Sequence, residues 1–140
     1  HGGTFPLFEI SAGDRAPAEF ASAARAYAVL NLSLALQTST ALRRVGLQDD
    51  SIVYTEGEFR NNEDYNRILA SLHPTCSFRL SGMPEATSFG AALLGWSALE
   101  EVAVSSMANR FDLTEEAVEG VELPGLDEYA AAFYGHLEQR

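Results

Sequence analysis

Apolar side chains recur at helical spacing over residues 18–45, the longest such stretch in the chain. The segment has no internal Gly or Pro and is rich in Ala, which favours a helix. Gly46 follows Arg43 and Arg44, a combination typical of a helix end, because glycine readily leaves the helical conformation and the positive charges suit the helix dipole. The middle of the segment is apolar on nearly every side. We therefore expect a long helix at the centre of the fold.

Residues 51–55 have a different pattern, in which Ile52, Val53 and Tyr54 are consecutive. Such a run is typical of a strand that is covered on both faces. Gly57 interrupts the run, and apolar positions then return at helical spacing over residues 63–72. The sequence thus predicts a strand, a glycine turn and a short helix in succession.

Further elements flank this unit on both sides. An extended segment over residues 2–10, interrupted by Pro6, suggests an edge strand ahead of the long helix. Alternation of helices and strands is typical of an α/β layer. We expect one domain over residues 1–140, with the long central helix packed on a small sheet and flanked by other helices. The remaining predicted elements are a strand over residues 76–80, a helix over 85–107, a short helix capped by Thr114 with Glu115 and Glu116 in its first turn, and a closing helix over 127–140.

The charge balance narrows the classes of partner. The chain has 20 acidic and 9 basic residues, for a formal net charge of -11, and no stretch concentrates Lys or Arg. Nucleic acids and anionic membranes bind to concentrated positive charge, so we expect neither as a partner. Hydrophobic residues make up 46% and charged residues 21%, as in an ordinary globular domain.

Cysteine content and apolar runs indicate the compartment. Cys76 is the only cysteine, so no intrachain disulfide can form and a reducing environment is the simpler assumption. The longest apolar-rich segment is broken by charged and amide side chains, unlike a membrane span. These features predict a cytoplasmic protein. Because the chain begins with His1 rather than methionine, we expect it to be a fragment.

Signatures of common catalytic and metal sites are missing from the sequence. His1, His73 and His136 are far apart, and no cluster of Cys or His accompanies Cys76, so a zinc site is not expected. Neither a G-x-S-x-G elbow, an H-E-x-x-H helix nor a G-x-x-x-x-G-K-[ST] loop occurs. Hydrolase triads, zincins and P-loop enzymes therefore lack their usual motifs.

Residues 51–62 form the remaining candidate site, because a helix that follows a strand and a glycine turn presents free N–H groups to an anion or nucleotide. Two interpretations are open. Gly57 can be a simple turn residue, with Asn61 as helix N-cap and Asp64 completing a capping box. Glu58 places negative charge where a phosphate would lie. On spacing alone, the structural interpretation is favoured.

Two motifs, in the right order along the chain, favour the nucleotide interpretation instead. The first is Thr-Glu-Gly-Glu-Phe-Arg-Asn-Asn over residues 55–62, which leads into the helix over 65–72; the second is Glu-Ala-Thr-Ser-Phe-Gly-Ala-Ala over residues 85–92. The segments 5–8 and 129–137 agree with the same pattern. Together they resemble the C-terminal part of the FGGY-family carbohydrate kinases, and the resemblance covers almost the whole chain.

The resemblance implies a partial ribonuclease-H-like, actin-like ATPase fold, in which two domains close over ATP and this half holds the adenosine side. Gly57 and Asn61 match family positions that contact the nucleotide, and Glu58 occupies the adjoining turn position. Mg-bound ATP and a sugar are the implied substrates. The family's Asp-Gly-Thr loop, sugar pocket and catalytic aspartate belong to an N-terminal kinase domain, so no catalytic or metal-binding residue is implied within this chain.

One departure from the family pattern leaves a second function open. Many relatives have paired glycines at the turn, whereas here Glu56 and Glu58 flank a single Gly57. The alternative is a non-catalytic regulatory or interaction domain that retains the kinase fold. A domain separated from its neighbours also exposes former interfaces, so a homodimer is among the expected assemblies.

Overall fold

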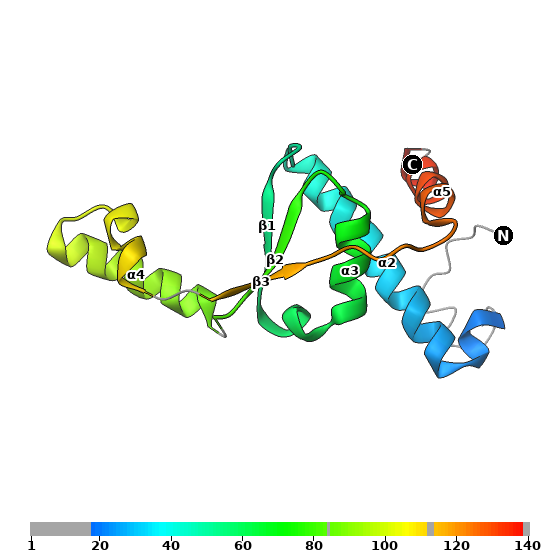
Figure 1. Ribbon diagram of the computed structural model, residues 1–140, viewed down its shortest axis with the longest axis horizontal. Coiled ribbons are helices and arrows are strands. Elements are labelled where there is room, and N and C mark those ends of the chain that lie inside the picture. Colours follow the sequence, from blue (N-terminus) through cyan, green and yellow to red (C-terminus); the bar gives the residue numbers. More distant parts are fainter. Residues whose placement is uncertain (1–17, 84, 112–113, 139–140) are drawn as a thin grey trace.

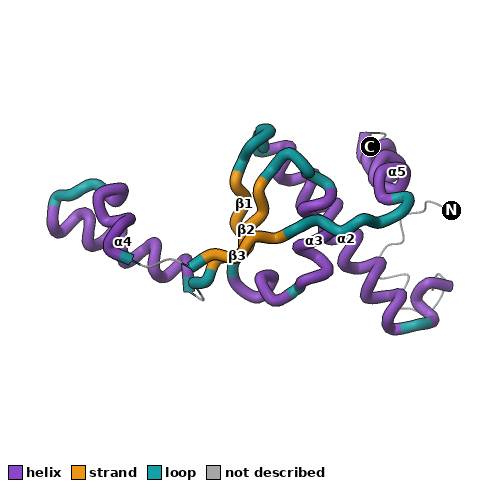
Figure 2. Tube along the Cα trace, viewed as in Figure 1, coloured by secondary structure: helices purple, strands orange, loops and turns teal. Residues whose placement is uncertain are grey.

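The computed structural model describes residues 18–83, 85–111 and 114–138, and departs from the predicted element order at two places (Figures 1 and 2). The predicted edge strand over residues 2–10 lies outside this part of the chain. The elements in chain order are the short helix η1 (Ala18–Ala21), helix α2 (Ala23–Arg44), strand β1 (Ile52–Thr55), the short helix η2 (Gly57–Asn61), helix α3 (Glu63–Ser71), strand β2 (Ser77–Ser81), helix α4 (Ala86–Glu100), the short helix η3 (Val104–Arg110), strand β3 (Glu115–Val118) and helix α5 (Leu126–Glu138).

Helix α2 ends where the sequence predicts. Val45 donates to the carbonyl of Ala41 and Gly46 to that of Arg43. Gly46 adopts a φ of +87°, which glycine tolerates better than any residue with a side chain. The predicted start is less accurate, because residues 18–21 form a separate 3₁₀ turn and the α-helix begins at Ala23.

The sheet has three strands in the order β1-β2-β3. Strand β1 runs parallel to β2, with Val53 opposite Phe78, and β3 runs antiparallel to β2, with Val118 opposite Phe78 on its other side. Since alternate side chains of a strand point to opposite faces, these three residues share one face. Phe78 is 4% exposed, which identifies this face as the buried one.

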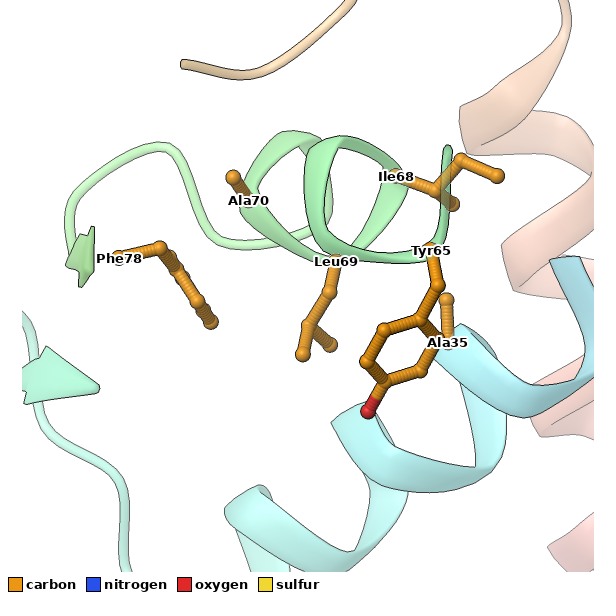
Figure 3. Close-up of a cluster of buried hydrophobic side chains, with 6 residues drawn as sticks. All are labelled: Ala35, Tyr65, Ile68, Leu69, Ala70 and Phe78. Atoms are coloured by element: carbon orange, nitrogen blue, oxygen red, sulfur yellow. The ribbon is translucent and has the colours of Figure 1, made fainter. Parts of the chain in front are cut away.

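The core lies between that face and the two helices α2 and α3. Helix α3 contributes most of it, and it packs against both α2 and the strands. The long helix therefore meets the sheet largely through α3, not directly as the sequence suggested (Figure 1). The buried hydrophobic cluster consists of Ala35, Tyr65, Ile68, Leu69, Ala70 and Phe78 (Figure 3).

The first departure from prediction concerns Glu115 and Glu116. They belong to strand β3, not to a helix capped by Thr114. The carbonyl of Thr114 accepts a hydrogen bond from Gly82, and the next residues pair with the free edge of β2. A strand edge in need of partners thus outweighs the local preference of acidic residues for a first helical turn.

The second departure is the end of α4, at Glu100 and not near residue 107. Glu101 adopts the left-handed conformation, with a φ of +54°, and residues 104–110 form η3. The ring of Phe111 packs edge-on against Phe89 of α4 at 4.8 Å between centroids. Closing this small aromatic cluster requires the chain to turn back along α4, which a continuous helix would prevent.

Helix α5 contacts the C-terminal part of α2 through Tyr134. The hydroxyls of Ser39 and Tyr134 lie 2.8 Å apart, and the guanidinium of Arg43 lies over the Tyr134 ring, 4.5 Å from its centroid. The closing helix is thus confirmed, with α5 spanning Leu126–Glu138. No helix in the described residues is long and apolar enough to cross a membrane.

Candidate nucleotide site at the Gly57 turn

The turn after β1 has the predicted form of strand, glycine and helix. Glu56 is extended, and Gly57 then adopts a φ of +64° as it opens η2. A Cβ built on Gly57 would meet no atom within 4 Å. Glycine is therefore favoured here by the backbone conformation, and not by lack of space among the described residues. The backbone at this point is also open to an approaching ligand.

Asn62, not Asn61, caps helix α3. Its side-chain oxygen accepts from the backbone N–H of Tyr65 at 3.1 Å. Its amide nitrogen donates at 2.8 Å to Oδ1 of Asn31, which is 1% exposed on α2. This corrects the structural interpretation of Asn61: the second asparagine of the pair performs the cap, which leaves the first one, Asn61, exposed and available for other contacts.

Asn66 holds the turn on the other side. Its Nδ2 donates to the carbonyls of Phe59 and Asn62, both at 2.8 Å. The ring of Phe59 also packs against that of Tyr65, with centroids 4.9 Å apart. The turn between Gly57 and Asn62 is therefore fixed to α3 by side chains, so that its exposed groups are presented in one arrangement.

A hollow of about 430 Å³ lies beside this turn, between the start of α3 and the sheet. The carboxyl ends of the parallel strands β1 and β2 meet here, the usual position of ligand sites in open α/β sheets. Its volume lies within the range of small-molecule sites. The hollow is lined by Arg60, Asn61, Glu63, Asn66, Arg67, Leu80, Glu116, Ala117, Val118 and Glu119.

Two lining residues carry buried polar atoms without a hydrogen-bond partner among the described residues. They are Oδ1 of Asn66, which is 2% exposed as a residue, and Nε of Arg60. Buried polar atoms are normally paired, so these two side chains are incompletely satisfied within the described part of the chain.

The charge of the hollow is mixed. Arg67 forms a salt bridge with Glu63 at 3.4 Å, and Glu116 and Glu119 line the opposite wall. An uncharged ligand group that forms hydrogen bonds fits such a wall better than a phosphate, which the carboxylates would repel.

The structure brings only some of the predicted residues together. Asn61 lines the hollow, whereas Gly57 and Glu58 lie on the preceding turn of η2 and are exposed. Sequence reasoning missed Asn66, although a polar residue between the buried Tyr65 and the apolar stripe of α3 is itself an indication of a specific role.

His73 is a buried titratable group outside this site. It is 8% exposed and stacks on Phe78, with ring centroids 6.1 Å apart. Burial, and secondarily the positive charge of Arg43, lower the pKa of His73 below 6.5. No group of three or more His, Cys, Asp or Glu residues that could hold a metal ion occurs in the described ranges.

Fold and site together define an α/β domain with a hollow at the carboxyl edge of parallel strands. Comparison with protein families gives the particular class: residues 1–104 match the family described as carbohydrate kinase FGGY, C-terminal domain. The chain belongs to this family of sugar kinases. No curated protein and no solved structure matched the chain.

Proposed function

We propose that this chain supplies part of the adenosine-binding wall of a kinase that transfers the γ-phosphoryl group of Mg-ATP to a sugar hydroxyl. The family match supports the reaction class, since FGGY kinases are phosphotransferases that act on carbohydrates. The observation that carries the local assignment is the hollow beside the Gly57 turn, which the exposed Asn61 lines at the start of α3.

Adenosine suits the chemistry of this hollow. The exposed amide of Asn61 has both a donor and an acceptor, so it can form hydrogen bonds with ring nitrogens, an amino group or ribose hydroxyls. Leu80 and Val118 supply apolar surface for a base. The triphosphate and its Mg ion would lie farther out, away from Glu116 and Glu119, because phosphate and carboxylate repel one another.

The rest of the reaction requires groups outside this wall. In phosphoryl transfer, catalysis consists mainly of positioning and electrostatic stabilisation by Mg and cationic groups, with an aspartate as base for the attacking hydroxyl. We assign these groups to an N-terminal kinase domain. The 140-residue chain by itself should therefore bind Mg-ATP weakly or not at all, and calorimetric binding at micromolar concentration would contradict the proposal.

The decisive test substitutes Gly57 by Val in the intact kinase, with Gly46→Val as the matched control. Both glycines have positive φ and open space around a built Cβ, so both substitutions introduce similar backbone strain. Only Gly57 adjoins the candidate site. We expect the KM for ATP to rise about tenfold in Gly57→Val, the effect of losing about 1.4 kcal/mol of binding, while the KM for the sugar stays unchanged in both variants.

An equal effect of the two substitutions on the KM for ATP would refute the assignment. Absence of sugar phosphorylation by the intact protein, over a panel of pentoses, hexoses and polyols, would instead favour the non-catalytic domain.

A further inference from the structure

Asn66 is a buried polar side chain whose hydrogen bonds reach the Gly57 turn. It lies in the first half of α3 and is 2% exposed, so its amide is shielded from water. Its Nδ2 donates to the backbone carbonyls of Phe59 and Asn62, each at 2.8 Å. Because both neighbours can only accept, the nitrogen of the amide and not its oxygen must face the turn.

The two carbonyls lie on either side of Asn61 along the chain. Phe59 precedes Asn61 by two residues, and Asn62 follows it directly. The backbone N–H of Asn62 also donates to the carbonyl of Phe59, at 3.1 Å, at the end of η2. The amide of Asn66 thus holds both ends of the short segment that carries Asn61, a residue that lines the hollow.

Helix η2 depends on α3 for its attachment. None of the residues of η2, Gly57–Asn61, is buried, and the side chain of Glu56 makes no cap bond at its start. Short 3₁₀ segments also have poorer hydrogen-bond geometry than α-helices. Besides the bonds from Asn66, the links to α3 are the cap on Tyr65 and the packing of the Phe59 ring against the Tyr65 ring. Of these links, the bonds from Asn66 act on the backbone on both sides of Asn61.

A role in stability alone would not require an amide at position 66. A buried amide costs free energy unless it is hydrogen bonded, and asparagine is a poorer helix former than leucine or alanine. The buried positions that follow in α3, Ile68, Leu69 and Ala70, are apolar. What the amide adds to their packing is a donor that reaches a carbonyl outside the helix.

We propose that Asn66 is a positioning residue for nucleotide binding, which holds the backbone of η2 so that the amide of Asn61 is oriented before the nucleotide enters the hollow. This inference rests on the proposed function, because it assigns a residue to the same site. Asn66 acts through Asn61 and does not need to touch the nucleotide. A segment that is ordered in advance raises affinity, since the ligand does not have to order it on binding.

Two substitutions in the intact kinase test this role. Asn66→Ala removes both bonds to the turn. Asn66→Ser removes only the bond to Phe59, because a serine within a helix donates to the carbonyl four residues earlier, here that of Asn62. In both variants we expect the KM for ATP to rise about fivefold to tenfold, the effect of leaving the turn to be ordered by the nucleotide. The KM for the sugar and kcat should stay unchanged, since the lost interaction affects nucleotide binding and not the chemical step.

Ser71→Ala is the matched control, at the other end of α3. The Ser71 hydroxyl donates to the carbonyl of Val121 at 2.8 Å and accepts from its N–H at 2.7 Å, and neither residue lines the hollow. The control therefore removes side-chain bonds to the backbone without touching the turn, and both KM values should stay unchanged. A loss of folded protein lowers the apparent kcat and not the KM. An equal rise of the KM for ATP in Ser71→Ala, an unchanged KM for ATP in Asn66→Ser, or unfolding of both Asn66 variants by circular dichroism overturns the positioning role.

Asn61→Ala separates failure of this inference from failure of the proposed function. An unchanged KM for ATP in Asn61→Ala refutes the site, and the positioning role with it. A higher KM for ATP in Asn61→Ala but not in Asn66→Ser leaves the site in place and overturns the positioning role alone. Because Asn66 acts through Asn61, the double variant should have the KM for ATP of the more affected single variant. Multiplication of the two effects would mean that the residues act independently, and it also overturns the inference.

Discussion

Replacement of Asn62 by Ala removes two interactions that join the Gly57 turn to the core. The side chain accepts from the N–H of Tyr65 at 3.1 Å, and it donates at 2.8 Å to Oδ1 of Asn31. Asn31 is 1% exposed, so water cannot readily replace the lost donor. The substitution therefore tests both the helix cap and the link between α3 and α2.

The expected loss of stability follows from these two interactions. Removal of an N-cap side chain costs about 1 kcal/mol. A buried acceptor left without a partner costs about 1–3 kcal/mol more. We expect Asn62→Ala to lower the free energy of unfolding by about 2–4 kcal/mol, whereas Asn61→Ala, at the adjacent exposed position, should stay within about 0.5 kcal/mol of the unsubstituted chain.

Urea denaturation followed by far-UV circular dichroism measures both variants. With an m-value of about 1.5 kcal/mol/M, the midpoint of Asn62→Ala should fall by about 1.3–2.7 M. Asn62→Asp should recover much of the loss, because its carboxylate retains the cap and the Asn31 amide can rotate to donate to it. Equal midpoints for Asn61→Ala and Asn62→Ala would refute the reasoning, since the two asparagines would then be equivalent.

Three further substitutions probe the rest of the fold. Because the pKa of His73 lies below 6.5 in the folded chain, the unfolded chain binds the proton more readily, and stability should fall as pH is lowered from 6.5 towards the folded-state pKa. In His73→Phe the urea midpoint should depend less on pH over this window, and an unchanged pH dependence contradicts the assignment. In Gly82→Ala the Cβ would lie 2.0 Å from Oγ1 of Thr114 and 2.6 Å from its carbonyl oxygen. We therefore expect about 1–3 kcal/mol of destabilisation and faster amide exchange in β3. The control Gly135→Ala, which has open space in α5, should not destabilise the chain. Tyr134→Phe removes the partner of the fully buried Ser39 hydroxyl and should cost about 1 kcal/mol in urea denaturation; no loss would mean that α5 does not depend on this bond.

Local sequence information was sufficient for the turn itself. Glycine at position 57 is required by a backbone conformation, and conformational preference is a property of the residue alone. The end of α2 at Gly46 and the apolar stripe of α3 were predictable for the same reason. The identity of the cap was not, because Asn61 and Asn62 have the same side chain and only the packing against Asn31 distinguishes them.

The sequence pattern could not predict the hollow beside the turn. Its walls come from η2, α3, β2 and β3, and Glu116 was expected in a helix. Position 66 has the side chain of a surface residue but is 2% exposed. Only the pairing of β3 with β2 places Glu116 opposite Arg60 across one hollow.

The sequence by itself determined the succession of most helices and strands, the glycine turn and the kinase family, because these depend on local periodicity, backbone preference and short motifs. The tertiary structure decided which asparagine caps α3, that residues 115–118 form a strand, and that α4 ends at Glu100. Each of these depends on a partner distant in the chain: a buried amide on α2, the free edge of β2, and the ring of Phe111 that packs against Phe89 of α4.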